Sequence, residues 1–492
     1  MAEALRTKTD VGELLKDAAL FREASFINGE WITGGTTLAV RNPASGEVVG
    51  IIPDLGAHET RRAIDAANAA LPAWRALPAA KRSALLEAWF NAINQHTDDL
   101  AKILTVEQGK PLAESRGEIS YGAGFVKWFA EEGKRIYGET IPSPTADRRI
   151  VVLKEPVGVC AAITPWNFPN AMITRKVAPA LAAGCTIILK PSELTPFSAL
   201  ALAVLAERAG FPKGVINIVT GQPGPIGEAL TSSNIVRKLS FTGSTRVGRY
   251  LMEKSAGTLK RLSLELGGNA PFIIFDDADM DRAMKGVMAS KFRNAGQTCV
   301  SANRILVRES IYDEFASKLT KKVSGLVVGE GLQENATVGP LINDAATEKV
   351  LGHIDDARTR GAVATVGGGS HSLGGHFVAP TVLTGMDPGM RISSEETFGP
   401  VAPLFRFNSE DEAIELANST PYGLAAYFYA RDVGRIFRVS ERLDYGIVGA
   451  NDPLPTGPHI PFGGYKESGL GRENGSMGID HFLETKAVSI GI

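Results

Sequence analysis

Residues 160–190, CAAITPWNFPNAMITRKVAPALAAGCTIILK, decide the fold class. Small and β-branched residues at 160–164 and 186–190 predict two short buried strands, and the apolar spacing of 170–184 between them predicts a helix. Two strands joined by a helical crossover lie parallel in one sheet, because the helix returns the chain to the edge where it started. The stretch therefore predicts a βαβ unit.

The same alternation continues along the chain in both directions. It predicts helices at 59–74, 81–109, 196–210 and 244–257, and strands at 214–220, 238–243 and 261–266. A second alternating series begins with PFIIF at 271–275 and runs past residue 440. Because 492 residues exceed what one core supports, we expect a doubly wound α/β domain followed by a second α/β domain from about residue 270.

The composition excludes several function classes. Apolar residues make up 44% of the chain and charged residues 22%, with a net charge of -2, so no basic surface for nucleic acid is expected. The longest mostly apolar segment, 177–189, is bracketed by lysines and is too short to span a bilayer. The first 20 residues include acidic side chains and lack the apolar centre of a secretory signal, which predicts a cytoplasmic location.

The three cysteines differ in their surroundings. Cys160 and Cys185 lie in apolar stretches and are expected to be buried thiols, and no CxxC spacing indicates a metal site. Cys299 lies instead in the polar stretch RNAGQTCVSAN, residues 293–303. A thiolate nucleophile needs such a setting, and a helix beginning at Cys299 would lower its pKa. The alternative is a spare surface cysteine.

Polar or glycine-rich stretches follow four of the predicted strands, where ligands bind in open α/β sheets. They are TPWNFP (164–169), KPSELTP (190–196), FTGSTRVG (241–248) and LELGG (264–268). Gly243 and Gly248 suit a backbone that approaches phosphate at a helix N-terminus, although a tight turn would also explain them. Lys190 and Glu193 suit ribose hydroxyls, or simply a solvated strand end.

Two further residues complete a candidate catalytic set. Glu265 lies between leucines, so burial would raise its pKa towards neutrality, where a general base works best. Asn167 offers a neutral amide donor for a developing oxyanion. With Cys299 as nucleophile, these groups indicate covalent chemistry at a carbonyl carbon. A cysteine hydrolase without redox chemistry would leave the four cofactor-type stretches unexplained.

Six motifs, TPWNFP, LKPSE, FTGST, LELGG, GQTC and EETFGP, occur in this order over nearly the whole chain. Together they resemble the aldehyde dehydrogenase superfamily. The resemblance implies a discontinuous Rossmann-type nucleotide-binding domain (1–139 and 159–268), an α/β catalytic domain (269–470) and a small β oligomerisation arm (140–158 and 471–492). It also implies a homodimer or homotetramer.

The resemblance assigns a role to each candidate residue. Cys299 attacks an aldehyde, Asn167 holds the oxygen of the thiohemiacetal, hydride passes to a nicotinamide, and Glu265 activates the water that hydrolyses the thioester. The cofactor residues implied are Trp166 and Asn167 beside the cofactor, Lys190 and Glu193 at the adenosine ribose, Gly243 and Ser244 at the pyrophosphate, Leu266 at the nicotinamide, and Glu396 at the nicotinamide ribose. Glu193 favours NAD over NADP, whereas Lys190 could attract the extra phosphate of NADP.

Stretches such as NAMITRKVAPALAAGC and SKFRNAGQTC are similar to succinate-semialdehyde dehydrogenases. In that subgroup the arginines corresponding to Arg175 and Arg293 hold the distal carboxylate of the substrate, a task for which a guanidinium is well suited. The segment 451–464 departs from the bacterial pattern, so glutarate semialdehyde or another ω-carboxy aldehyde is an alternative substrate. A CoA-acylating semialdehyde dehydrogenase is a further alternative, but it would lack the water-activating glutamate.

Overall fold

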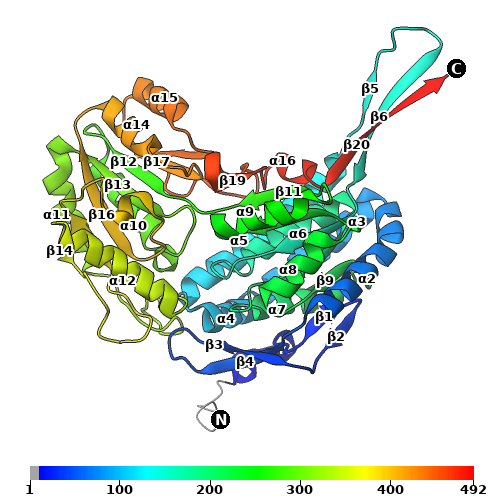
Figure 1. Cartoon of the computed structure of the whole chain (residues 1–492), viewed down its shortest axis with the longest axis horizontal. Coiled ribbons are helices and arrows are strands. Elements are labelled where there is room, and N and C mark those ends of the chain that lie inside the picture. The colour runs from blue at the N-terminus through cyan, green and yellow to red at the C-terminus, as the bar shows by residue number, and fades with distance from the viewer. Residues whose placement is uncertain (1–9) are drawn as a thin grey trace.

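Two large sheets and one small sheet form the framework of the protein (Figure 1). The structure is a computed structural model that describes residues 10–492. Residues 1–9, which open the predicted nucleotide-binding domain and the segment considered as a secretory signal, lie outside the described residues. The two α/β units confirm the predicted fold class, and the small sheet projects from the body (Figure 1).

The first sheet contains the predicted βαβ unit, with β7 (Val159–Ile163), α6 (Ala171–Ala183) and β8 (Thr186–Lys190). Its eight strands run in the order β19-β11-β10-β7-β8-β9-β1-β2. The other parallel strands are β9 (Ile216–Ile218), β10 (Val236–Thr242) and β11 (Arg261–Glu265). The antiparallel strands are β1 (Ser25–Ile27), β2 (Glu30–Ile32) and β19 (Gly469–Leu470). The predicted end of the catalytic domain at residue 470 coincides with the end of β19, which is a strand of the first sheet.

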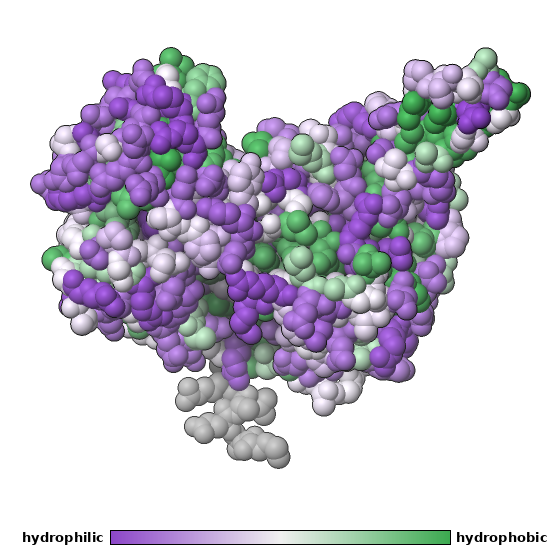
Figure 2. Space-filling model, turned by 45° about the horizontal axis from the view of Figure 1, so that its top comes forward, coloured by the Kyte–Doolittle hydropathy of each residue, from purple (hydrophilic) through white to green (hydrophobic). Residues whose placement is uncertain are grey.

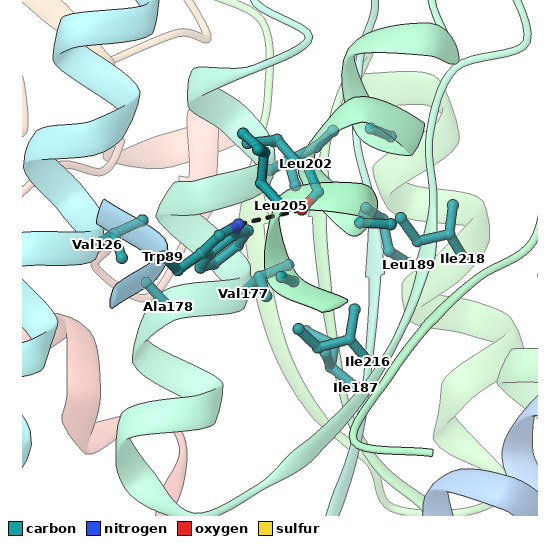
Figure 3. Packing of buried hydrophobic residues seen from close by; sticks show 14 of the residues in the cluster. Trp89, Val126, Val177, Ala178, Ile187, Leu189, Leu202, Leu205, Ile216 and Ile218 are labelled. Atoms are coloured by element: carbon teal, nitrogen blue, oxygen red, sulfur yellow. Dashed lines mark hydrogen bonds between the residues drawn. The ribbon is translucent and has the colours of Figure 1, made fainter. Parts of the chain in front are cut away.

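Helices pack against this sheet over an extensive apolar core (Figure 3). They are α2 (Ala57–Ala76), α3 (Ala79–Gln95), α4 (Thr97–Gln108), α5 (Leu112–Glu132), α6, α7 (Phe197–Arg208), α8 (Pro223–Ser232) and α9 (Thr245–Ala256). Trp89 of α3 lies in this core, and its indole Nε1 donates to the carbonyl of Leu202 at 3.1 Å (Figure 3). The single helix predicted over 81–109 is in fact two, because the chain leaves helical geometry at His96.

The second sheet begins at residue 270, as predicted, and has the order β14-β15-β16-β13-β12-β17-β18. Its strands are β12 (Ala270–Ile274), β13 (Ala302–Arg308), β14 (Val363–Val366), β15 (Thr381–Thr384), β16 (Val401–Phe407), β17 (Ala425–Tyr429) and β18 (Ile447–Ala450). Its helices are α10 (Met280–Lys291), α11 (Tyr312–Val323), α12 (Asp344–Thr359), α13 (Arg391–Ser394), α14 (Glu410–Asn418) and α15 (Val433–Arg442).

The small sheet is built from β5 (Glu139–Ile141), β6 (Arg148–Pro156) and β20 (Leu483–Gly491). β20 pairs antiparallel with β6 along its full length. The sheet projects from the body at the upper right of Figure 1, and apolar side chains are exposed on it in Figure 2. Ile141, Leu153 and Ile490 are among these exposed side chains. A hairpin of β3 (Thr37–Arg41) and β4 (Val48–Pro53) and the short helices α1 (Val11–Leu14) and α16 (Met477–Asp480) complete the fold.

Within residues 10–492, no helix combines the length and apolar character needed to cross a bilayer. In the same part of the chain, no group of three or more His, Cys, Asp or Glu side chains is arranged to hold a metal ion.

Candidate active site

A cavity of about 370 Å³ lies at the carboxyl ends of β7, β10 and β11 and extends to segments of the second α/β unit. Most of the predicted site residues line it: Trp166, Asn167, Arg175, Gly243, Ser244, Leu266, Arg293, Cys299 and Glu396. Glu265 lies directly before Leu266 at the end of β11, behind the cavity wall. Lys190 and Glu193 lie at the end of β8, away from this cavity.

Cys299 lines the cavity from a turn rather than from the start of a helix, so the predicted helix N-terminus is wrong. The preceding 3-10 segment, Arg293–Gly296, contains Asn294 and Ala295 in the left-handed region at φ 51° and 53°, and it leads into strand β13. Burial, reinforced by the negative charge of Glu396, raises the pKa of the Cys299 thiol to about 12. The prediction of a lowered pKa is therefore also wrong.

The amide of Asn167 is fixed by buried partners. Its Nδ2 donates to the carbonyl of Gln297 at 3.0 Å, which leaves one N–H of the amide for another acceptor. Its backbone carbonyl accepts from Lys110 Nζ at 2.7 Å and from Asn294 Nδ2 at 3.0 Å. Lys110 in turn pairs with Glu118 at 2.6 Å, and both side chains are 1% exposed. Sequence reasoning missed Lys110 and Glu118, because nothing local distinguishes them from surface charges.

Glu265 is buried, and neither of its carboxylate oxygens has a hydrogen-bond partner among the described residues. Burial first, and then the negative charge of Glu473, raises the pKa of Glu265 well above its usual value. Glu473 is the ionised member of this pair because two cations neutralise it. Lys176 Nζ bonds to its Oε1, and Arg175 Nε lies 3.0 Å from its Oε2, although not aligned as a hydrogen bond. The raised pKa that the sequence predicted for Glu265 is confirmed.

The two arginines of the cavity have different surroundings. Arg175 is 2% exposed, lies 3.6 Å from the ring centre of Phe462 and is partly neutralised by Glu473. Arg293 lies 5.4 Å from the ring centre of Phe168, and its Nε has no hydrogen-bond partner among the described residues. Arg293 is therefore the less neutralised of the two arginines.

Three further features fit a dinucleotide. Ser244 lines the cavity and directly precedes α9, and its Oγ accepts from Val247 N. The free N–H groups at the N-terminus of α9 therefore lie beside the cavity. Lys190 Nζ pairs with Glu193 Oε2 at 2.6 Å, which leaves the other carboxylate oxygen to accept from a hydroxyl. Glu396 Oε1 accepts from Gly268 N at 3.1 Å, and desolvation raises the pKa of Glu396 to about 7.

The aldehyde dehydrogenase family model matches residues 31–488. The chain belongs to the aldehyde dehydrogenase family. It is 59% identical over 480 residues to the succinate-semialdehyde dehydrogenase [NADP(+)] GabD of Escherichia coli, covering 97% of this chain and 100% of that protein. It is 56% identical over 479 residues to a glutarate-semialdehyde dehydrogenase of Pseudomonas aeruginosa, covering 97% and 99%.

A solved structure of betaine aldehyde dehydrogenase from Staphylococcus aureus, in complex with NAD+, superposes with a TM-score of 0.94. That protein is 37% identical, and the match covers 98% of this chain and 97% of that one. This aldehyde dehydrogenase therefore uses a nicotinamide cofactor and oxidises an aldehyde to a carboxylate. Both expectations from the six motifs are confirmed.

Proposed function

We propose that this enzyme oxidises succinate semialdehyde to succinate through a covalent intermediate on Cys299. One observation carries the choice of substrate: Arg175 and Arg293 line the same cavity as Cys299. A distal carboxylate would neutralise the free guanidinium of Arg293 while the aldehyde carbon lies at the sulfur. The similarity to the Escherichia coli protein supports the same substrate class.

In the first half of the proposed mechanism, the Cys299 thiol gives its proton to water, and the resulting thiolate sulfur attacks the aldehyde carbon. The carbonyl oxygen becomes an oxyanion, and the free N–H of the Asn167 amide donates to it together with a backbone N–H. Lys110 and Asn294 hold the Asn167 backbone, so the donor is in place before the charge develops. Leu266 and Glu396 of the cavity wall would hold a nicotinamide, which would supply the hydride acceptor for this carbon, and the acyl group would then be bound to Cys299 as a thioester.

In the second half, Glu265 accepts a proton from water, and the resulting hydroxide attacks the thioester carbonyl. The carbon–sulfur bond breaks, Cys299 leaves as a thiolate and the product is a carboxylate. Glu265 suits this step because its oxygens have no competing partner and its raised pKa makes it a stronger base than a surface carboxylate.

We further propose NAD as the preferred cofactor. The second oxygen of Glu193 is placed to accept from a ribose hydroxyl, and its charge opposes a 2′-phosphate. The ion pair with Glu193 also offsets the attraction of Lys190 for that phosphate. The same lysine would nevertheless allow NADP to be used as a second cofactor.

For the whole chain we propose the domain division predicted from the sequence, with the small sheet as the arm through which a second copy of this chain binds. The exposed Ile141, Leu153 and Ile490 on that sheet support a partner surface. A homodimer or homotetramer in the cytoplasm follows, and the three free thiols agree with a reducing compartment.

A panel of aldehydes with and without an ω-carboxylate, assayed with NAD and NADP separately, tests the substrate and cofactor together. We expect the highest kcat/KM for succinate semialdehyde with NAD, and low values for uncharged aldehydes of the same length. Glutarate semialdehyde is the second candidate, because the Pseudomonas aeruginosa relative bears that name and one methylene changes binding by only about 1 to 3 kcal/mol. Equal rates for charged and uncharged aldehydes would contradict the proposal.

Product analysis separates this mechanism from the CoA-acylating alternative. We expect a free carboxylate whether or not CoA is present, because Glu265 delivers water to the thioester. Formation of an acyl-CoA in preference to the carboxylate would assign the enzyme to the other reaction.

A further inference from the structure

We propose that His353 is a positioning residue that holds Glu396 against the cofactor cavity by binding the side chains on both sides of it. The proposal rests on the proposed role of Glu396 at the nicotinamide ribose. His353 itself does not line the cavity, since it lies on α12 with 0% of its surface exposed.

The geometry of residues 395–397 explains how one histidine can do this. The side chains of Glu395 and Thr397 lie on the side of His353, and the side chain of Glu396 lies on the side of Gly268. Glu395 Oε2 and Thr397 Oγ1 both meet the imidazole of His353, at 3.0 and 3.2 Å. Glu396 points the other way and accepts from Gly268 N at 3.1 Å.

The chemistry of the imidazole fixes its tautomer. A carboxylate can only accept, so Nε2 of His353 carries the proton and donates to Glu395. Nδ1 is then an acceptor, and the hydroxyl of Thr397 donates to it. A single neutral form of His353 therefore satisfies both neighbours of Glu396.

The charged surroundings keep this neutral form. Burial lowers the pKa of His353, and the positive charges of Lys349 on its own helix and Arg391 of α13 act in the same direction. Glu395 acts in the opposite direction, but Arg391 shares its charge through bonds of 3.2 and 3.1 Å. No change in the protonation of His353 is therefore needed during the reaction.

The backbone of this segment is held separately, which isolates the contribution of His353. Asn303 accepts from Thr397 N at 3.0 Å and donates to the carbonyl of Glu395 at 3.1 Å. On the other side, a Cβ on Gly267 would lie 3.2 Å from Glu396 Oε2, so the carboxylate fits closely over that glycine. Loss of His353 should leave the chain path intact but release the side chains that hold Glu396 in this fit.

His353→Phe and His353→Gln test the proposal in the full-length enzyme. Phe keeps a ring and removes both bonds, whereas Gln can still donate to Glu395. We expect His353→Phe to lower kcat/KM for NAD by about tenfold, equivalent to one or two lost hydrogen bonds. The kcat/KM of His353→Gln should lie between that of His353→Phe and that of the unchanged enzyme. The rate of p-nitrophenyl acetate hydrolysis without cofactor should stay within about twofold of that of the unchanged enzyme, because Cys299 and Glu265 are not altered.

His96→Gln is the matched control, since His96 also makes a side-chain bond, to Ala92 O at 2.8 Å, but does so between α3 and α4. It should change neither activity. Equal loss of ester hydrolysis and NAD-dependent oxidation in His353→Phe would mean a general structural role, and unchanged NAD kinetics would mean no role. Either result overturns the proposal.

Two more variants keep the test decisive. If His353→Phe does not fold, Thr397→Val removes one of the two bonds from the other side and should show a smaller loss of the same kind. Glu396→Gln tests the proposed function itself. If Glu396→Gln leaves NAD kinetics unchanged, the role of Glu396 is wrong; if it impairs them while the His353 and Thr397 variants do not, only the positioning role is wrong.

Discussion

The α-carbon of Gly268 lies directly against the backbone carbonyl of Cys299. A Cβ on residue 268 would come within 2.6 Å of that oxygen and within 3.5 Å of the Leu424 side chain. The glycine therefore allows the segment that follows Glu265 to touch the turn that carries the nucleophile. Two residues more than 30 positions apart are brought together by the absence of one methyl group.

Gly268→Ala should consequently displace Cys299 and destabilise the protein by about 1 to 3 kcal/mol, the usual cost of overpacking. We expect a lower melting temperature by calorimetry and a large loss of aldehyde oxidation. Gly257→Ala is the matched control, because a Cβ there meets nothing within 4 Å and the backbone φ is -63°. Similar behaviour of the two variants would contradict the close fit.

Glu265→Gln should stall hydrolysis of the thioester, because an amide cannot take a proton from water. We expect a burst of reduced cofactor close to one equivalent, followed by a steady-state rate lower by about 10² to 10⁴. Stopped-flow absorbance measures both phases. Cys299→Ala should abolish the burst as well, while NAD binding is retained. An unchanged steady-state rate in Glu265→Gln would exclude Glu265 as the general base.

The steady-state rate should also depend on pH through Glu265. Its folded-state pKa is raised, and a base works only when ionised, so the deacylation rate should rise as pH increases through that raised value. A single-turnover measurement of thioester hydrolysis across pH checks this. A profile that is flat from acidic to alkaline pH would point to another base.

Arg293→Ala should lower kcat/KM for succinate semialdehyde by about 10- to 100-fold, the loss expected for a charged hydrogen bond, with little effect on butanal. Arg293→Lys should recover only part of the loss, because a point charge lacks the fork of donors. Arg62→Ala, on the exposed face of α2, serves as the control. Equal effects of Arg293→Ala on both aldehydes would contradict the proposed contact between Arg293 and the substrate carboxylate.

Glu193→Gln should shift the cofactor preference towards NADP. Removing the carboxylate relieves its repulsion of a 2′-phosphate and frees Lys190 from its ion pair, so we expect the NADP/NAD ratio of kcat/KM to rise about tenfold or more. Glu253→Gln is the control, since that side chain is 75% exposed. An unchanged ratio would show that another residue selects the cofactor.

The fold could be predicted from the sequence because its strands and crossover helices carry their own periodicity. Helix α8 was not predicted, since PGPIGEALTS begins with proline and glycine and shows only a short apolar pattern. The helix predicted to begin at Cys299 is absent, because the chain turns at Cys299 and enters strand β13 at Ala302.

The candidate site was predicted where its residues lie in polar stretches at strand ends, and missed where a role depends on distant contacts. Glu473 lies about 300 positions from Lys176, and His353 meets Glu395 across two separate elements. No local pattern marks either pair. Each contact becomes evident only when segments distant in the sequence are folded together.

Strand β19 belongs to the first sheet, and Ser468 directly before it also contacts the second unit, where its Oγ accepts from Gly423 N at 2.9 Å. The strand pairs with β11 beside Glu265, and Ser468 accepts from Leu266 N at 2.9 Å and donates to Gly267 O at 2.7 Å. A hinge that swung the sheets apart would have to break the bond between Gly423 and Ser468, next to the strand pair that carries the catalytic carboxylate. Substrate and product should therefore exchange without a change in the distance between the two sheets.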